Sequence, residues 1–166
     1  MIITLTQGQV AEVDAEDFPR ISQHKWYACW FPGTRSFYAM RRKTVGAKKQ
    51  IGILLHREIL GLEKGDIRLG DHIDGNTLNN SRGNLRIATP SQNCRNQKIR
   101  INNKSGYKGV SWRKDTEKWA AYINFDGKKN HLGFFSTPEQ AHAAYCSAAA
   151  KHHGEFARFD SNEVRL

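Results

Sequence analysis

A dense group of polar side chains lies in Gly70–Gln97, and its residue types suit metal-assisted hydrolysis. His72 follows Asp71 directly, and a second carboxylate, Asp74, comes two residues later. The ordinary pKa of His lies near neutral pH, so this side chain can take a proton from water. A carboxylate and the amide oxygen of Asn93 are hard oxygen donors of the kind that Mg²⁺ prefers. One cation held by so few protein ligands would keep room for a phosphate and water.

Two strands and a capped helix are expected to position these residues. Arg68–Ile73 and Asn84–Ala88 predict strands on either side of a polar loop. Thr89-Pro90-Ser91-Gln92 predicts a helix start, because the Thr can cap free N–H groups, the Pro fits the first helical position and the Gln completes a capping box. The separation from His72 to Asn93 is 21 residues, enough for loop, strand and one helical turn to return Asn93 towards Asp71.

The same segment resembles the HNH endonucleases, in particular their phage-type and homing members. These enzymes share a ββα-metal finger, in which a strand ends at the catalytic His and a helix returns a metal ligand. Residues 1–60 also resemble the short β-rich region that precedes the finger in that group. The matching pieces are Asp71-His72-Ile73-Asp74-Gly75-Asn76, Asn79-Asn80, Asn84-Leu85-Arg86 and Asn93.

The resemblance implies a role for each residue of the finger. It implies that His72 is the general base and that Asp71, rather than Asp74, holds the metal together with Asn93. Asn84 matches the central Asn of the motif, a member of the catalytic set whose role is to brace the loop and orient His72. Many members have His where this chain has Asn93, so Mg²⁺, or alternatively Mn²⁺, is expected rather than zinc or nickel.

Simpler interpretations compete with these assignments. Taken singly, Asp71, Asp74 and Asn76 could be turn formers, since Asp and Asn favour loops. Taken together, and in this order across almost thirty residues, the polar residues favour a catalytic metal site over simple turns. His56 lies in an apolar run, and we interpret it as a structural residue ahead of the finger rather than a catalytic one.

Composition and charge point to a polyanionic partner. The chain has 166 residues, with 26 Lys and Arg against 16 Asp and Glu, a net charge of +10. Between Arg95 and His131 there are ten basic residues against three acidic ones, interleaved with aromatic side chains, which favours salt-dependent phosphate binding over a merely solvated face. No apolar run is long enough for a membrane span, and three Cys without a C-x-x-C pair exclude a disulfide scaffold and a Cys-ligated structural zinc. We therefore expect an intracellular, cytoplasmic protein, as in a bacterial or phage-infected cell.

The carboxy-terminal third predicts three strands and one helix. The strands are Tyr107–Arg113, Lys118–Phe125 and Lys129–Phe135, with an Asp-Gly hairpin signal before the third, and Thr137 is expected to cap the helix. Ser105 to about Asp160 closely resembles the AP2 (ethylene-response-factor type) DNA-binding domain. The matching residues are Gly106-Tyr107-Lys108-Gly109-Val110, Lys118-Trp119-Ala120-Ala121-Tyr122-Ile123, Leu132-Gly133-Phe134-Phe135-Ser136-Thr137 and Gly154-Glu155-Phe156-Ala157.

The resemblance implies that the three-stranded sheet enters the DNA major groove with the helix packed behind it. Because neighbouring side chains on a strand point opposite ways, Val110 and Trp112 are expected to face the helix. Several positions differ from the plant pattern, so the preferred DNA sequence does not carry over. The residues expected to face DNA are Lys108, Ser111, Arg113, Tyr122, Asn124, Lys129 and His131.

These patterns together predict an α+β protein. The expected parts are an HNH endonuclease domain at 1–97, with a β-rich part at 1–60 and a finger at about 66–97, a basic linker at 98–105 and an AP2-like domain at 106–162. The predicted function is site-specific or semi-specific hydrolysis of duplex DNA with one divalent metal, by a monomer without an obligatory protein partner. The alternatives are a non-catalytic DNA-binding regulator with a degenerate HNH-like loop and, on charge alone, an RNA-binding protein.

Overall fold

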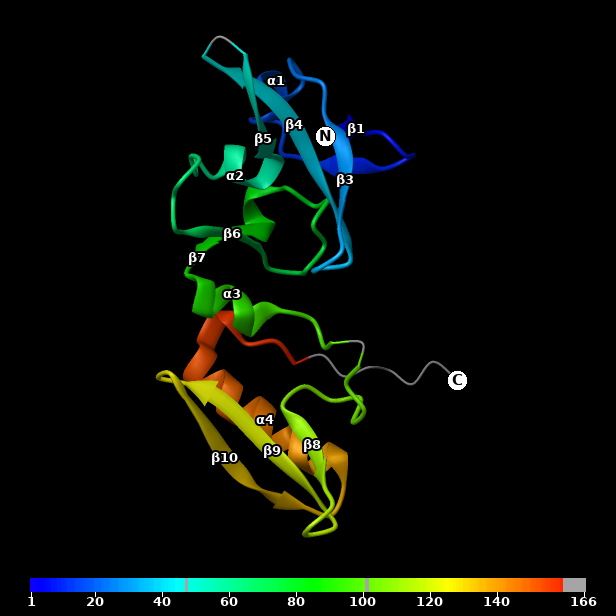
Figure 1. Cartoon of the computed structure of the whole chain (residues 1–166), viewed down its shortest axis with the longest axis vertical. Helices are drawn as coiled ribbons and strands as arrows, with labels where there is room; N and C mark the ends of the chain where they lie inside the picture. The colour runs from blue at the N-terminus through cyan, green and yellow to red at the C-terminus, as the bar shows by residue number, and fades with distance from the viewer. Residues whose placement is uncertain (47, 101, 160–166) are drawn as a thin grey trace. The chain divides into compact units, whose positions relative to one another are not determined.

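The computed structural model describes residues 1–46, 48–100 and 102–159, and it has the expected α+β fold. Its described part contains four helices and ten strands, and every strand pairing within its sheets is antiparallel. The chain divides into two compact units, unit 1 at Met1–Asn93 and unit 2 at Cys94–Leu166. The boundary falls within α3, and Figure 1 labels the elements of each unit.

Unit 1 contains three small sheets. The strands β1 (Ile2–Thr4) and β2 (Val10–Glu12) form the first, and β3 (Tyr27–Phe31), β4 (Ser36–Val45) and β5 (Lys49–Leu54) form the second, in the order β3-β4-β5. The third sheet pairs β6 (Leu69–His72) with β7 (Leu85–Ala88). The remaining elements are α1 (Phe18–Ile21), α2 (Leu55–Ile59), the 3₁₀ helix η1 (Arg82–Asn84) and the first residues of α3 (Pro90–Asn96).

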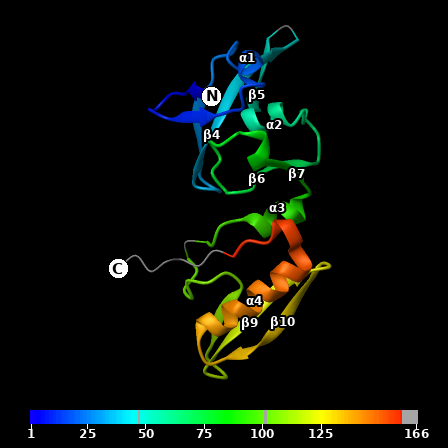
Figure 2. The same ribbon diagram turned by 180° about the vertical axis from the view of Figure 1, so that it is seen from behind.

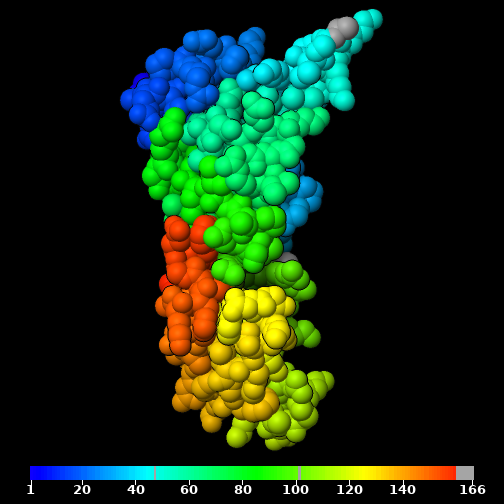
Figure 3. Space-filling view, turned by 90° about the vertical axis from the view of Figure 1, so that its left-hand side faces the viewer, coloured from blue at the N-terminus to red at the C-terminus, as the bar shows by residue number. Residues whose placement is uncertain are grey.

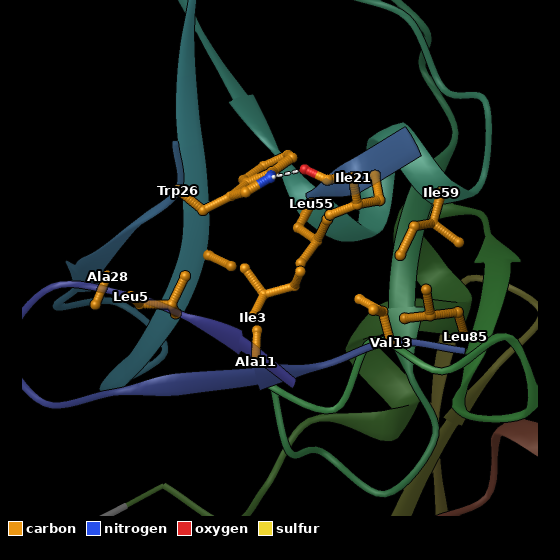
Figure 4. Close-up of a cluster of buried hydrophobic side chains, with 11 residues drawn as sticks. Ile3, Leu5, Ala11, Val13, Ile21, Trp26, Ala28, Leu55, Ile59 and Leu85 are labelled. Carbon is orange, nitrogen blue, oxygen red and sulfur yellow. Dashed lines mark hydrogen bonds between the residues drawn. The ribbon is translucent and has the colours of Figure 1, made fainter. Parts of the chain in front are cut away.

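One hydrophobic core connects the amino-terminal strands to the predicted finger (Figure 4). Ile3 of β1 and Val13 after β2 lie in the same buried cluster as Leu55 of α2 and Leu85 of β7. The buried Trp26 indole donates a hydrogen bond to the Ile21 carbonyl at 2.9 Å, so its polar N–H is satisfied inside this core. The β6–β7 ribbon is therefore anchored through Leu85 to residues at the amino-terminal end of the chain, Ile3 and Val13.

The predicted capping box at the start of α3 is confirmed. The Thr89 hydroxyl accepts from the Gln92 N–H at 3.2 Å, and the Gln92 side-chain oxygen accepts from the Thr89 N–H at 2.8 Å. These reciprocal bonds satisfy two backbone donors that the first turn cannot pair internally. The direction in which α3 leaves the end of β7 is thus fixed locally.

Unit 2 is a three-stranded antiparallel sheet with one helix on one face (Figure 2). The strands β8 (Val110–Arg113), β9 (Lys118–Phe125) and β10 (Lys128–Phe135) are ordered β10-β9-β8, and α4 (Pro138–His153) leads into η2 (Gly154–Phe156). Asp126 and Gly127, at φ 50° and 70°, form the predicted two-residue hairpin turn, since a type I′ turn needs positive φ at both positions. Thr137 caps α4, and its hydroxyl accepts from the Gln140 N–H at 3.3 Å.

Part of the expected linker is folded into unit 2. The Ser105 hydroxyl contacts the carbonyls of Tyr107 and Val110 at 3.0 and 2.9 Å, and the Asn103 side chain donates to the Tyr107 carbonyl at 3.1 Å. These bonds organise the turn that leads into β8.

Candidate active site

The β6 strand presents Asp71 and His72 side by side, and both are buried. Asp71 lies opposite Arg86 in the β6–β7 register, and the two form an ion pair. The Arg86 Nε and Nη2 atoms both lie 2.8 Å from Asp71 Oδ2. The guanidinium balances the charge of the buried carboxylate and donates a charged hydrogen bond to its Oδ2.

The tautomer of His72 is set by Asn80. The Asn80 amide is oriented by its own Nδ2, which donates to the Leu78 carbonyl at 2.9 Å, so its Oδ1 faces His72 Nε2 at 3.4 Å. Because Oδ1 can only accept, Nε2 must carry the hydrogen and Nδ1 the lone pair. Burial lowers the pKa of His72, although the Asn80 contact and the charges of Asp71 and Asp74 oppose this shift. The imidazole is therefore neutral at neutral pH and able to accept a proton.

His56 and Tyr38 complete an aromatic cluster around His72. The His56 and His72 rings have centroids 4.9 Å apart in an edge-to-face arrangement, and Tyr38 lies 5.7 Å from His56 and 6.2 Å from His72. Burial, then the nearby His72 and Arg57, lowers the pKa of His56 to about 3, so its ring is neutral. His56 thus contacts the candidate base directly.

Close packing brings β6 onto the His56 ring. A Cβ at position 70 would lie 2.5 Å from His56 Cδ2, which leaves room only for Gly70. In the sequence, His56 stood out only as a His within the apolar run that precedes the finger. Its contact with His72 could not be predicted from that position.

Asn84 braces the polar loop between β6 and β7. Its Oδ1 accepts from the Asp74 N–H at 3.0 Å, while its Nδ2 donates to Asp74 Oδ1 and to the Asn79 carbonyl, both at 2.9 Å. Asp74 also accepts from the Asn76 N–H at 2.7 Å and the Asn79 amide at 3.2 Å. Burial raises the pKa of Asp74, but these hydrogen bonds outweigh it and hold the pKa below its ordinary value. Asp74 is therefore a loop-forming carboxylate in this structure, and the choice of Asp71 rather than Asp74 as the metal ligand stays a prediction.

An ion-pair network ties the far end of this loop to α1. Arg82 in η1 contacts Asp17 through Nε at 2.8 Å and Nη2 at 3.0 Å, and its N–H donates to Asp14 at 2.7 Å. Asp17 is buried and also accepts from Arg20 at 2.8 Å. Burial raises the pKa of Asp17, but the hydrogen bonds from Arg82 and Arg20 prevail and lower it overall.

Asn93 lies one turn into α3, half-buried, and its N–H bonds to the Thr89 carbonyl at 2.9 Å. Within the described ranges, no group of three or more His, Cys, Asp and Glu side chains is placed to hold a metal ion. A metal in unit 1 would therefore need a smaller set of carboxylate and amide oxygens. Asp71 and Asn93 stay the ligands predicted from the sequence, and hard oxygens of this kind suit Mg²⁺ or Mn²⁺.

Comparison with known proteins identifies the family. The family described as HNH endonuclease matches residues 54–95, the region from the end of β5 through α2, the β6–β7 ribbon and most of α3. An uncharacterized HNH endonuclease of Acanthamoeba polyphaga mimivirus is 33% identical over 152 residues, covering 91% of this chain and 74% of the relative. The chain belongs to the HNH endonuclease family.

A second relative of this HNH protein has an uninformative name. Protein 3.8 of Escherichia phage T7 is 37% identical over 107 residues, 63% of this chain and 88% of the phage protein. No solved structure gives a significant match. Family membership implies a nuclease that acts on DNA and, as HNH domains generally do, uses a divalent metal. In the described residues, no helix is long and apolar enough to cross a membrane.

Unit 2 brings six of the seven residues expected to face DNA onto one surface. The register pairs Lys129 with Asn124 and His131 with Tyr122, and the face opposite α4 is completed by β8. The Tyr122 ring is at its centre, with Lys129 Nζ 3.9 Å above it and His131 at 5.1 Å. We call these residues the outer face of unit 2: Ser111, Arg113, Tyr122, Asn124, Lys129 and His131.

Lys108 has contacts within unit 2, and its expected role in DNA binding stays a prediction. Its Nζ donates to the carbonyls of Arg95 and Gln97, so it joins two segments of unit 2. It precedes β8 and is not governed by strand alternation. Trp112 differs from expectation, since it remains 46% exposed and packs edge-to-face on Trp119.

Proposed function

We propose that this HNH protein hydrolyses phosphodiester bonds of duplex DNA in unit 1, with one divalent metal, and is targeted by an AP2-like unit 2. The observation that carries the proposal is the state of His72. It is a neutral imidazole with its tautomer set by Asn80, and it lies beside the oriented carboxylate of Asp71. All of these residues lie inside the region that matches the HNH family.

In the proposed reaction, His72 is the general base. Its Nδ1 takes a proton from the attacking water while Nε2–H remains directed at Asn80 Oδ1. The water oxygen bonds to phosphorus as the bond from phosphorus to the 3′ oxygen breaks, and the leaving 3′ oxygen takes a proton from solvent water, which gives 5′-phosphate and 3′-hydroxyl ends. Asn84 keeps the loop closed around this geometry through its bonds to Asp74 and Asn79, so its role is positional.

The proposed metal ligands are Asp71 and Asn93, and Mg²⁺ is the expected ion, with Mn²⁺ as a substitute. When bound, such an ion supplies charge stabilisation at the phosphate and at the leaving oxygen. Arg86 holds Asp71 Oδ2 at 2.8 Å, which keeps the carboxylate oriented in the folded protein.

The outer face of unit 2 is proposed to bind duplex DNA. Arg, Asn and Lys side chains can bond base edges or phosphates, and a small sheet can enter the major groove. The AP2-like sequence pattern and the six residues gathered on one face support this role.

The nuclease activity can be tested on supercoiled plasmid. The plasmid is incubated with the full chain in Mg²⁺, with the full chain in EDTA, and with the His72→Ala variant in Mg²⁺. The matched control is His24→Ala, because His24 is exposed. We expect relaxed circles, or linear fragments, that need both the metal and His72 but not His24. DNA binding without cleavage in Mg²⁺ and Mn²⁺, on plasmid and on long phage DNA, would instead favour the non-catalytic regulator. A monomer with one finger is expected to nick, which the ratio of circles to linear product measures.

A further inference from the structure

Positive charge in unit 1 is concentrated in one hairpin. Residues 1–93 contain 13 Lys and Arg against 9 Asp and Glu, and five of these basic residues lie between positions 41 and 49 without an acidic one among them. The rest of unit 1 then has 8 basic against 9 acidic residues. The β4–β5 hairpin therefore carries the whole positive excess of the unit. Its basic residues are Arg41, Arg42, Lys43, Lys48 and Lys49.

The outer half of this hairpin extends beyond the rest of unit 1 (Figure 3). Val45 pairs with Lys49 and Lys43 pairs with Ile51, so Lys43 and Lys49 lie on the same face of the ribbon. Both lysines and Lys48 are exposed. Arg41 is used differently, because its guanidinium forms a bidentate ion pair with Glu58 at 2.7 and 3.1 Å.

The opposite face of the ribbon is polar. Arg42, Thr44 and Gln50 share it, and Arg42 lies 3.3 Å from the Gln50 side-chain oxygen. The lysine face also carries Val45 and Ile51, but the lysines interrupt these apolar side chains, so the ribbon lacks the continuous apolar face needed to enter a lipid bilayer. Its width instead fits the major groove of a DNA duplex, which admits a two-stranded ribbon.

The groove of about 720 Å³ at the base of the hairpin is a less suitable site for DNA. Its lining mixes cations with Glu58, Glu63 and Asp66, and Arg57 there donates to the carbonyls of Glu63 and Arg68. Lys43 also lines this groove, whereas Lys48 and Lys49 lie outside its lining and are exposed, so a phosphate can contact them away from these carboxylates.

We propose that the β4–β5 hairpin is a second DNA-binding element, which contacts the phosphates of a duplex through Lys43, Lys48 and Lys49. The proposal rests on the proposed function for its substrate class, duplex DNA, but not on cleavage. Through this hairpin, unit 1 would bind the DNA substrate independently of the outer face of unit 2. Acidic residues prevail in the remainder of unit 1, so the nuclease unit would otherwise bind a polyanion weakly.

The test compares two charge-matched double variants in a His72→Ala background. Lys43→Gln/Lys49→Gln alters the hairpin, and Lys25→Gln/Lys151→Gln removes the same charge from exposed positions elsewhere. Binding of the full chain to a short fluorescent DNA duplex is measured in EDTA over a range of salt concentrations. For the hairpin variant we expect the slope of log affinity against log salt to fall by about 2, with roughly 10- to 60-fold weaker binding near 0.1 M salt.

Equal slopes for the two double variants would overturn the proposal. A photo-cross-linking residue in place of Val45 provides a second measurement, with Ile2 as the control, since these side chains are 43% and 53% exposed. Cross-linking to duplex DNA is expected from position 45 and not from position 2. Stronger competition by RNA of equal charge would assign the hairpin to another nucleic acid and contradict the proposal. Since the assays do not depend on cutting, a failure of nuclease activity would be distinguishable from a failure of the hairpin.

Discussion

Replacing His56 with Ala should slow DNA cleavage by about 10- to 100-fold with little change in KM, the effect expected when a residue that orients a catalytic group is lost. The His56 ring lies edge-to-face on His72 and directly beneath Gly70. Removing it leaves a cavity under β6, into which the backbone that carries Asp71 and His72 can relax. The base then moves relative to the scissile phosphate, which changes kcat rather than ground-state binding.

The same cavity lowers stability, and this effect must be separated from the effect on cleavage. Loss of the buried His56 ring should lower the free energy of unfolding by about 2–4 kcal/mol, which is similar to or smaller than the effect of a Phe→Ala change in a core. Ile59→Ala is the matched control, because Ile59 is buried in the same helix and belongs to the hydrophobic core of unit 1. Both variants are assayed in single turnover with saturating Mg²⁺, well below their melting temperatures. Equal cleavage rates for His56→Ala and Ile59→Ala would refute a positioning role.

His56→Phe identifies which property of His56 matters. The pKa of His56 is lowered to about 3 by burial, so a neutral ring is already present at neutral pH and Phe removes no charge. Packing alone therefore predicts that Phe restores most of the rate, apart from a stability cost of about 1–3 kcal/mol for the larger ring. A rate for Phe as low as that for Ala would show that a ring nitrogen of His56 is needed, contrary to the packing argument.

Three further changes test the surrounding networks. Asp17→Asn should cost about 1–2 kcal/mol at neutral pH through the loss of charged hydrogen bonds to Arg82 and Arg20. Because the pKa of Asp17 is lowered in the folded state, this stabilisation is present above the unfolded pKa and is lost as pH falls through the folded pKa, so the urea midpoints of the variant and the parent should converge as the solution is acidified. Lys108→Met should destabilise unit 2 by about 1–2 kcal/mol yet leave the salt slope of DNA binding unchanged, whereas Lys129→Gln should lower that slope by about 1. Arg86→Met should destabilise unit 1 by about 3 kcal/mol, and Asp71→Leu/Arg86→Met should recover this loss in a melting experiment while abolishing cleavage.

Features of the fold that depend on local rules could be predicted from the sequence. The Asp126-Gly127 turn and the capping box at Thr89 are decided within four residues, and both are present as expected. The network of Arg82 with Asp17 was not predictable in this way, because it joins residues 65 positions apart. Only the packing of α1 against η1 brings the two side chains together.

The candidate site shows the same division. The chemical roles that the motif assigns within the finger stay predictions, and the structure adds how Asn84 and Asp74 hold the loop. The contact of His56 with His72 depends on the packing of α2 against β6 and has no local signature. The hydrogen bonds of Lys108 to the carbonyls of Arg95 and Gln97 also have no local signature, because its long side chain reaches back from the turn before β8.

The buried ion pair of Asp71 with Arg86 is more readily explained by function than by stability. Both side chains are about nine-tenths buried, and desolvating two charges costs about as much as their attraction returns. A well-packed apolar pair at these facing strand positions would serve the fold equally well. The proposed role of Asp71 as a metal ligand, by contrast, would require a carboxylate at this position. Arg86 allows unit 1 to bury that carboxylate in the folded protein, which such a role would need and a β-ribbon as such would not.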